Sequence, residues 1–223
     1  MRVMVWGGSG LVGSACLRYL LKDDRVTEVI APTRRPLALS HGKLSNPQVD
    51  FARIATLGSL FEGVDCVVSA LGTTLRQAGS RENFRRIDHD YNLAIAQAAR
   101  AGGVGRYCLV SAVGADDQSL IFYSRIKGEL ERRVIGLGFP SLFLYRPGLL
   151  VGEREHFRLG ESLAIKTSGL MNLLMQGPLK PFRAIRGEVV GRALANHAAA
   201  PEASEGTHFL YYPEIVSMSG QSA

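Results

Sequence analysis

The chain opens on the stretch Arg2-Val3-Met4-Val5-Trp6-Gly7-Gly8-Ser9-Gly10-Leu11-Val12-Gly13, and this stretch decides the fold. Its first half is apolar and predicts a buried strand, and the leucines that follow Gly13 at helical spacing predict a helix. A glycine turn between a strand and a helix leaves backbone N–H groups at the helix start, where the helix dipole favours negative charge. A Cβ would obstruct the turn or the approach of phosphates. The stretch therefore predicts a dinucleotide-binding site.

Length and composition limit the class of protein. A chain of 223 residues with 46% hydrophobic and 21% charged residues is large enough to bury a core without disulfides, so we expect one domain over residues 1–223. Cys16, Cys66 and Cys108 are widely spaced in apolar segments, which predicts buried free thiols and no metal site. No apolar run is long enough to cross a bilayer. We therefore expect a cytoplasmic protein with no membrane association.

The net charge of +6 raises the question of a nucleic-acid partner. Nucleic-acid binding requires basic residues gathered on one surface, whereas here they are scattered along the chain. We therefore expect no nucleic acid, and we assign the charge to solubility and an anionic cofactor. The expected partner is a small-molecule substrate. A second copy of the chain or another protein could also pair with the long helices expected at 81–101 and 117–137, unless these helices only cover the sheet.

Strand and helix patterns alternate along the rest of the chain. Helices are expected over 81–101 and within 117–137, and apolar runs predict further strands at 26–33, 47–51, 65–71, 106–111 and 141–146. This alternation predicts an α/β fold, a doubly wound parallel sheet of Rossmann-like type with helices on both faces. The regularity ends near Gly148. The remaining segments predict a small C-terminal lid at 149–186, a surface helix at 189–200 and a frayed tail at 217–223.

A general acid and its supporting groups are predicted from Ser111, Tyr123 and Lys127. Tyr123 and Lys127 are four residues apart in a helical segment, so both side chains lie on one face. Ser111 ends a strand at the carboxyl edge of the sheet, where such folds bind ligands. A tyrosine hydroxyl titrates near ~10 in water, and a neighbouring ammonium favours the phenolate. Tyr123 could then exchange a proton with a substrate oxygen that Ser111 also hydrogen-bonds. The alternative is a surface Tyr–Lys pair beside an unrelated serine.

The choice of cofactor is predicted from the end of the second strand. An Asp or Glu there would accept a hydrogen bond from the ribose 2′-hydroxyl of NAD. This chain instead has Thr33-Arg34-Arg35 and no acid. Because guanidinium groups match a phosphate in bidentate geometry, we predict NADP and regard NAD as the less favoured cofactor. The alternative is a solvated basic loop.

Other strand ends predict the rest of the pocket. Asp50 could accept from the adenine amino group or simply form a turn, and the threonines after Gly72 could contact cofactor or substrate. Asp88 could cap or hold a water, and Arg76 could meet an anionic substrate. The full set of predicted cofactor contacts is Gly7, Ser9, Gly10, Leu11, Val12, Gly13, Thr33, Arg34, Arg35, Asp50, Phe51, Leu71, Gly72, Thr73, Tyr123, Lys127, Arg146, Pro147 and Gly148.

With these segments in order, residues 2–150 resemble the atypical short-chain dehydrogenases, and more narrowly the oxidoreductases related to the HIV-1 Tat-interactive protein. The resemblance implies a Rossmann-like domain, NADP(H) binding and catalytic positions at Ser111, Tyr123 and Lys127. The chain departs from the pattern at Asp88, where many short-chain dehydrogenases place an active-site Asn. The segments that carry the resemblance are Gly7–Gly13, 49–51, Leu71–Thr74, 88–91, 101–103, 111–116, 122–131 and 145–150.

Three functions are compatible with these residues. The first is an NADP-dependent oxidoreductase that transfers hydride between the nicotinamide and a small carbonyl or alcohol, with Tyr123 as general acid and base. The second is a non-catalytic regulatory protein that responds to NADP(H), since members of the family are described as acting through protein contacts. The third is a sugar-nucleotide epimerase or dehydratase, which is less favoured because such enzymes carry a larger C-terminal substrate domain.

Overall fold

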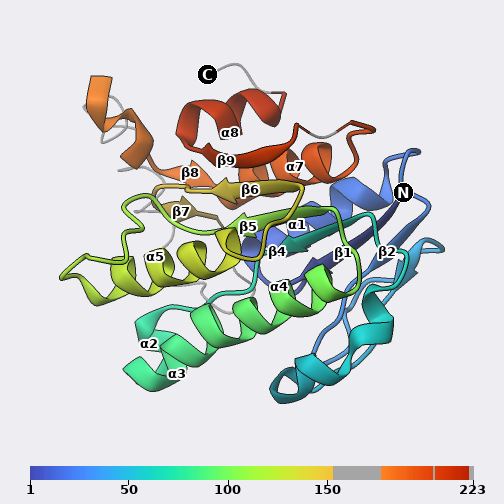
Figure 1. The fold of residues 1–223 in the computed structure, drawn as a ribbon. Helices are drawn as coiled ribbons and strands as arrows, with labels where there is room; N and C mark the ends of the chain where they lie inside the picture. Colours follow the sequence, from blue (N-terminus) through green and yellow to red (C-terminus); the bar gives the residue numbers. More distant parts are fainter. Residues whose placement is uncertain (153–176, 203, 221–223) are drawn as a thin grey trace.

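A computed structural model describes residues 1–152, 177–202 and 204–220. The predicted doubly wound α/β architecture is confirmed. In these residues a seven-stranded, all-parallel sheet runs in the order β3-β2-β1-β4-β5-β6-β9 (Figure 1). The strands are β1 (Arg2–Trp6), β2 (Glu28–Ile30), β3 (Leu44–Ser45), β4 (Cys66–Ser69), β5 (Arg106–Val110), β6 (Ser141–Tyr145) and β9 (Gly206–Leu210).

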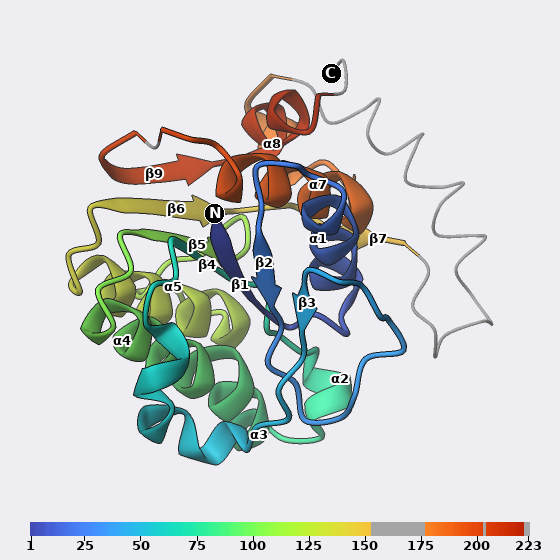
Figure 2. The same ribbon diagram turned by 90° about the vertical axis from the view of Figure 1, so that its right-hand side faces the viewer.

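Helices cover both faces of the sheet, as Figure 2 shows. On one face α1 (Leu11–Leu21) lies beside α7 (Gly187–Ala198), with α8 (Tyr212–Met218) next to α7. On the other face lie α4 (Tyr91–Ala101) and α5 (Phe122–Ile135). Each helical layer buries a separate apolar core against the sheet. The remaining elements are α2 (Leu75–Ala78), α3 (Arg81–Arg85), η1 (Phe51–Thr56), η2 (Gly58–Phe61), η3 (Arg86–Asp90), η4 (Gly177–Phe182) and the paired strands β7 (Leu150–Val151) and β8 (Ile185–Arg186).

The helix predicted over 81–101 is present but is not uniform. α3 and α4 are joined by η3, a π-helical segment of five residues at Arg86–Asp90. π-helical turns are rare and are found frequently at functional sites. This one places Asp88 and His89 in the buried interior of the protein. The π-helical turn therefore makes the segment around Asp88 a candidate part of a functional site.

The third strand was predicted in the wrong place. The paired residues are Leu44–Ser45, and the expected segment 47–51 contributes only an isolated bridge between Thr33 and Gln48. Pro47 has no N–H to donate to a strand ladder. Asp50 ends the extended segment because its Oδ1 accepts from the Ala52 N–H at 2.9 Å and caps η1. Asp50 therefore forms a turn, and its predicted contact to the adenine amino group stays a prediction.

The C-terminal predictions also need correction. The helix at 187–198 is not a surface helix, since Val190, Ala193 and Leu194 are fully buried against α1. A Cβ on Gly191 would lie 2.5 Å from the Ala15 Cβ, so small residues let the two helices approach closely. Strand β9 was not predicted, because it is an edge strand in which only Leu210 is buried. The first part of the expected frayed tail at 217–223 is instead helical to Met218, and Ser219 is buried with its Oγ donating to the Val216 carbonyl at 2.7 Å, while residues 221–223 lie outside the described residues.

The segment expected to form a lid lies mostly outside the described residues. Residues 153–176 are not described, and the flanking segments form the short β7–β8 pair and η4. The lid therefore stays a prediction. None of the helices in the described part of the chain is long and apolar enough to span a bilayer. Cys16, Cys66 and Cys108 are buried and free, as predicted.

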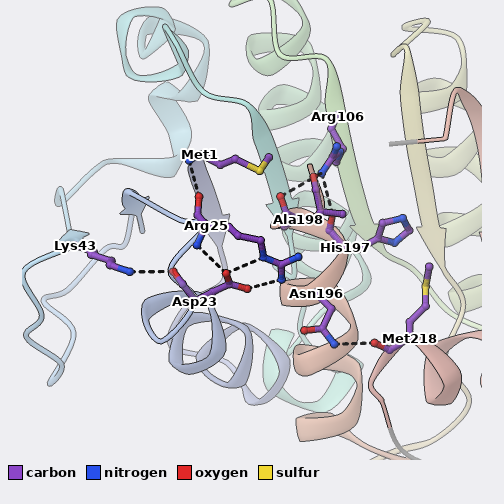
Figure 3. A network of polar contacts seen from close by, with 10 residues as sticks. Met1, Asp23, Arg25, Lys43, Arg106, Asn196, His197, Ala198 and Met218 are labelled. Atoms are coloured by element: carbon purple, nitrogen blue, oxygen red, sulfur yellow. Dashed lines mark hydrogen bonds and ion pairs between the residues drawn. The ribbon is translucent and has the colours of Figure 1, made fainter. Parts of the chain in front are cut away.

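The end of α7 is held by a buried arginine from the central sheet (Figure 3). Arg106 Nη1 donates to the carbonyls of His197 at 2.9 Å, Ala198 at 3.3 Å and Ala200 at 2.8 Å. A cation at a helix C-terminus satisfies its free carbonyls and complements the helix dipole. The neighbouring His197 ring packs on Phe143, and its Nδ1 lies 2.8 Å from the Tyr145 hydroxyl. This cluster ties α7 to β5 and β6 of the sheet.

The cluster predicts loss of stability in weak acid. Burial, together with the charges of Arg106 and His208, lowers the pKa of His197 from 6.5 to about 4. Between these values the unfolded chain binds the extra proton, so the free energy of unfolding falls as the pH drops from 6.5 to 4, by about 2 kcal/mol after allowing for partial exposure. Urea unfolding of wild type and His197→Gln at several pH values measures this. In His197→Gln the free energy of unfolding should fall less steeply between pH 6.5 and 4 than in wild type. His41→Gln, a control in an exposed loop, should keep the wild-type slope. Equal pH slopes in all three proteins would contradict the assignment.

Candidate active site

The glycine turn lies at the carboxyl end of β1, where the sequence predicted it. Gly7 has φ +82°, and a Cβ on it would lie 2.5 Å from the Ala70 carbonyl oxygen. The Gly10 N–H donates to the Gly7 carbonyl at 2.8 Å and closes the turn. A Cβ on Gly13 would lie 2.2 Å from that same carbonyl oxygen, so the helix presses directly onto the turn. Gly7 and Gly13 are therefore required by the close approach of backbone, whereas a Cβ on Gly10 would lie 3.2 Å from the Gly7 carbonyl oxygen.

The start of α1 is open to an anion. Gly10 is the N-cap and provides no side-chain hydrogen bond, and no acidic side chain lies in the first turn. The amide groups of this turn and the positive end of the helix dipole are thus available to phosphate oxygens. Ser9 is exposed beside the turn, and Val12 is buried in the core. The Leu11 side chain packs where a Cβ on Gly187 would lie, 2.4 Å from its Cγ, so Leu11 fixes α7 to the turn.

The basic loop after β2 is braced by a residue that sequence reasoning missed. Asn46 Nδ2 donates to the Ala31 carbonyl at 2.6 Å and to Thr33 Oγ1 at 2.8 Å, and its Oδ1 accepts from the Leu37 N–H at 2.9 Å. Thr33 Oγ1 in turn donates to the Arg35 carbonyl at 2.7 Å. Thr33 therefore shapes the loop rather than offering a free hydroxyl. No spacing in the sequence relates Asn46 to this loop, because their proximity follows from the β2–β3 pairing.

The two loop arginines are exposed, unlike Thr33. The Arg34 guanidinium lies over the Phe51 ring, with its Cζ 5.7 Å from the ring centroid. Phe51 itself is buried, packing edge-on against Trp6 at 5.4 Å and Tyr91 at 5.9 Å. Phe51 thus holds one arginine in place from inside the core. Both arginines are exposed on the loop that follows β2, and the predicted choice of NADP stays a prediction.

The loop after β4 is fixed by two buried polar residues of the 81–101 helix. Asn92 is fully buried and accepts from Ser69 Oγ at 2.6 Å, while its Nδ2 donates to the Leu71 carbonyl at 3.1 Å. Asp88 Oδ2 accepts from the Thr73 N–H at 2.8 Å. Asn92 was not singled out from the sequence. Thr74 serves as the N-cap of α2, with its Oγ1 accepting from the Gln77 N–H at 3.2 Å, and Arg76 lies in the same helix.

The three predicted catalytic residues all lie at the carboxyl end of the sheet, where β5 ends and α5 begins. Ser111 follows β5 and is 4% exposed, and its Oγ has no hydrogen-bond partner in the described residues. Tyr123 is near the start of α5 and is exposed, with its ring 5.7 Å from the Phe84 ring. Lys127 follows one turn later, and its Nζ lies 2.8 Å from Asp88 Oδ1. Lys127 also interacts electrostatically with Tyr123.

Lys127 is the residue of this catalytic set whose pKa is shifted. Burial alone would lower the pKa of Lys127, but Asp88, Tyr123 and Glu131 outweigh it and raise that pKa above 10.5. Lys127 is therefore an ammonium at neutral pH. A buried hydroxyl without a partner, such as that of Ser111, is a ready donor to a ligand oxygen. The arrangement can move a proton to or from a bound oxygen atom.

The segment at the end of β6 has partners within the protein. Arg146 forms a buried ion pair with Glu131 of α5 and donates to the Tyr211 hydroxyl at 2.9 Å, and its guanidinium lies 4.5 Å from the Phe209 ring centroid. The Pro147 carbonyl accepts from the Val113 N–H at 2.9 Å. A Cβ on Gly148 would lie 2.3 Å from the Arg183 carbonyl oxygen. These residues join β6, α5 and the C-terminal elements, and their predicted contacts to a cofactor stay a prediction.

The described residues fit a nicotinamide dinucleotide. The uncapped helix start can take the pyrophosphate, the buried Ser111 hydroxyl lacks a partner, and both lie at the carboxyl ends of parallel strands. In open parallel sheets, ligands bind beyond these ends, where the strand order reverses. Here the order reverses between β1 and β4, next to the glycine turn.

Comparison with known proteins supports the same conclusion. A family model described as NAD(P)H-binding matches residues 7–133. The protein fmp52, mitochondrial, of Emericella nidulans is 36% identical over 230 residues, covering 96% of this chain and 97% of the relative. The protein HTATIP2 of Rattus norvegicus is 36% identical over 170 residues, covering 75% and 70%. Among solved structures, MoeE5 in complex with UDP-glucose and NAD has a TM-score of 0.68 at 18% identity, covering 99% of this chain and 81% of that one.

These relatives correct one expectation. We expected a cytoplasmic protein, but several of the relatives, from Emericella nidulans, Aspergillus niger, Scheffersomyces stipitis and Eremothecium gossypii, are named as mitochondrial proteins. The cytoplasmic prediction is therefore wrong. It rested on free buried thiols, which indicate a reducing environment but do not distinguish one reducing compartment from another.

The glycine turn, the parallel sheet and the similarity to these relatives agree with one another. The fold is an NAD(P)-binding, Rossmann-like fold, and it is similar to the fold of solved NAD-bound proteins such as MoeE5. The chain belongs to the NAD(P)H-binding family and is a homologue of the Fmp52 and HTATIP2 proteins.

Proposed function

We propose that this protein is an NADP-dependent oxidoreductase of the short-chain dehydrogenase type, acting on a small carbonyl or alcohol. One observation carries the proposal. A buried ammonium, Lys127, lies one helical turn from Tyr123 while the buried Ser111 hydroxyl has no partner in the described residues. Structural polar groups at this depth are normally satisfied. The unpartnered hydroxyl is best explained by an oxygen atom that arrives with a ligand.

Each residue has a separate role in this proposal. NADPH supplies the hydride when it is bound. Tyr123 donates its hydroxyl proton to the carbonyl oxygen that becomes an alcohol, and takes a proton back in the reverse direction. Lys127 stabilises the phenolate that remains on Tyr123. Ser111 donates a hydrogen bond to the same substrate oxygen and stabilises its developing negative charge.

The test is consumption of NADPH against a panel of aldehydes, ketones and quinones. Turnover of any of these substrates that depends on Tyr123 supports the oxidoreductase. Binding of NADPH without turnover across the panel would contradict it and favour the second candidate, a regulatory protein whose contacts change with NADP(H) occupancy. That candidate is favoured only by the resemblance to a family described as acting through protein contacts. A pure sensor has no need of Lys127 and Tyr123 on one helical face.

We also propose that Arg34 and Arg35 bind the 2′-phosphate and so select NADP. Both are exposed on a loop that Asn46 and Thr33 brace from beneath, and Phe51 holds Arg34 from inside. The double variant Arg34→Ala/Arg35→Ala should raise the Kd for NADPH by about 10- to 100-fold, because each charge-assisted hydrogen bond contributes ~1.5–3 kcal/mol before solvent screening.

Affinity for NADH provides the internal control, since NADH has no 2′-phosphate and its Kd should not change. Arg132→Ala/Arg133→Ala removes the same charge from the exposed end of α5 and should leave both affinities as they are. Equal weakening of NADPH and NADH in the loop variant would show that the arginines act on the shared part of the dinucleotide. Fluorescence titration with NADPH and with NADH measures both dissociation constants in wild type and in the two double variants.

A further inference from the structure

The carboxylate of Asp88 has a hydrogen-bond donor at each of its two oxygens. Oδ1 lies 2.8 Å from the Lys127 ammonium, and Oδ2 accepts from the Thr73 backbone N–H at 2.8 Å. We infer that Asp88 is a positioning residue that locks Lys127 and the Leu71–Thr73 loop into one unit, and that only a carboxylate at this position can do so. The inference rests on the proposed function in one respect, that Lys127 acts beside Tyr123.

The ion pair between Lys127 and Asp88 is almost completely buried. The side chains of Lys127 and Asp88 are 5% and 2% exposed. Charges this deep are tolerated only when paired and hydrogen-bonded, and removing one partner costs several kcal/mol. A pair this costly to bury, placed one helical turn from Tyr123, is better explained by the position it gives to Lys127 than by stability.

The π-helical segment η3 brings Asp88 to this place. The extra residue of a π turn leaves carbonyls without their usual helical partners. Asn92 contacts this turn and the neighbouring loop together, because its Nδ2 lies 3.1 Å from the Ile87 carbonyl and 3.3 Å from the Asp88 carbonyl, as well as 3.1 Å from the Leu71 carbonyl. One amide therefore supports both the π turn and the loop that Asp88 holds.

An amide cannot replace the carboxylate at residue 88. Both neighbours are donors, and Asp offers an acceptor to each, whereas Asn has one acceptor oxygen and one NH₂ donor. Asp88→Asn would face either the Lys127 ammonium or the Thr73 N–H with a donor. Gly72 confirms how closely the loop approaches, since a Cβ there would lie 3.2 Å from Asp88 Oδ1.

The other charged groups facing Lys127 do not take over this role. Tyr123 and Glu131 lie on its own helix, and both act on it electrostatically. Glu131 is engaged in the buried ion pair with Arg146, whose charge offsets its own. Asp88, from η3, is thus the remaining carboxylate whose charge is directed at the Lys127 ammonium in the described residues.

The decisive experiment follows the Lys127 ammonium itself. The chain has five lysines, so ¹⁵N-lysine labelling gives a simple side-chain spectrum in which Lys127→Arg identifies the signal. In wild type the signal should titrate above the ordinary lysine value. In Asp88→Asn it should titrate at lower pH than in wild type, because the effect of burial then loses the charge that opposes it most strongly. Asp90→Asn is the matched control: Asp90 lies in the same π segment, 54% exposed and bonded to His89.

The result that would overturn the inference is an unchanged Lys127 titration in Asp88→Asn. If Asp88→Asn does not fold, the double variant Asp88→Asn/Lys127→Met decides, because removing both charges should restore a folded protein. A double variant that also fails to fold would overturn the inference too. Hydrogen exchange of the Thr73 amide should speed up in Asp88→Asn and stay slow in Asp90→Asn.

A kinetic readout separates positioning from plain structural support. Once a substrate is found, Asp88→Asn should lower kcat, with the basic limb of its pH profile moved to lower pH, while the control keeps the wild-type profile. The Lys127 titration requires no turnover. Absence of activity in wild type would therefore contradict the proposed function and leave the spectroscopic test of Asp88 intact.

Discussion

Tyr123→Phe is expected to lower kcat for carbonyl reduction by about a hundred- to ten-thousandfold, the usual contribution of a positioned general acid. The ring remains to pack on Phe84, so the change removes only the hydroxyl. Binding of NADPH should be retained, because the glycine turn and the basic loop are untouched. Steady-state kinetics and fluorescence titration on the same protein preparation give both quantities.

The matched control is Tyr19→Phe, which removes a hydroxyl that donates to Glu188 at 3.2 Å on the opposite face of the sheet. It should leave turnover and cofactor affinity at the wild-type level. Turnover in Tyr123→Phe equal to that of wild type would exclude Tyr123 as the proton donor. Loss of NADPH binding in that variant would assign the hydroxyl to cofactor binding instead of proton transfer.

Gly13→Ala is expected to abolish cofactor binding and to lower the free energy of unfolding by at least about 3 kcal/mol, the upper part of the range for overpacking. The added Cβ would lie 2.2 Å from the Gly7 carbonyl oxygen and 2.7 Å from the Gly7 carbonyl carbon. These are backbone atoms, so no rotamer change relieves the overlap. The helix must move off the turn, and its first-turn amides then no longer converge on the phosphates.

Gly58→Ala serves as the control for the same chemical change. A Cβ on Gly58 would meet nothing within 4 Å, and its backbone is not in the left-handed region. This variant should keep wild-type stability and affinity, measured by urea unfolding and NADPH titration. Wild-type affinity in Gly13→Ala would show that the turn tolerates a wider opening than the distances indicate.

Local patterns in the sequence were sufficient for the central fold. Glycine turn chemistry and continuous apolar runs are short-range features, and they correctly located the strands that became β1, β4, β5 and β6. Pairing at the sheet edges was harder to predict. β3 has two residues and β9 has one buried residue, so neither carries the hydrophobic signal on which the prediction depends.

The residues of the candidate site also fall into those that local sequence predicts and those that depend on the folded chain. Ser111, Tyr123 and Lys127 are recognisable because their spacing has a chemical meaning on a strand end and a helix face. Asn92 and Asn46 are not, because each acts by joining segments that only the folded chain brings together. The role of Asp88 depends on a π turn, for which the sequence carries no periodic signal. The ion pair of Arg146 with Glu131 was likewise not predicted, because Glu131 lies in another element, and the cofactor contact of Arg146 stays a prediction.

The close contact between α1 and α7 limits which part of the chain can fold when it is separated from the rest. Gly187 and Gly191 have no side chains, so Leu11, Val12 and Ala15 of α1 pack directly against α7. The late helix α7 therefore supports α1, the helix that follows the glycine turn. The family model stops at residue 133, well before this support. Residues 7–133 alone would therefore lack the helix that covers α1. Expressed without α7, they would expose the apolar side of α1 and would tend to aggregate.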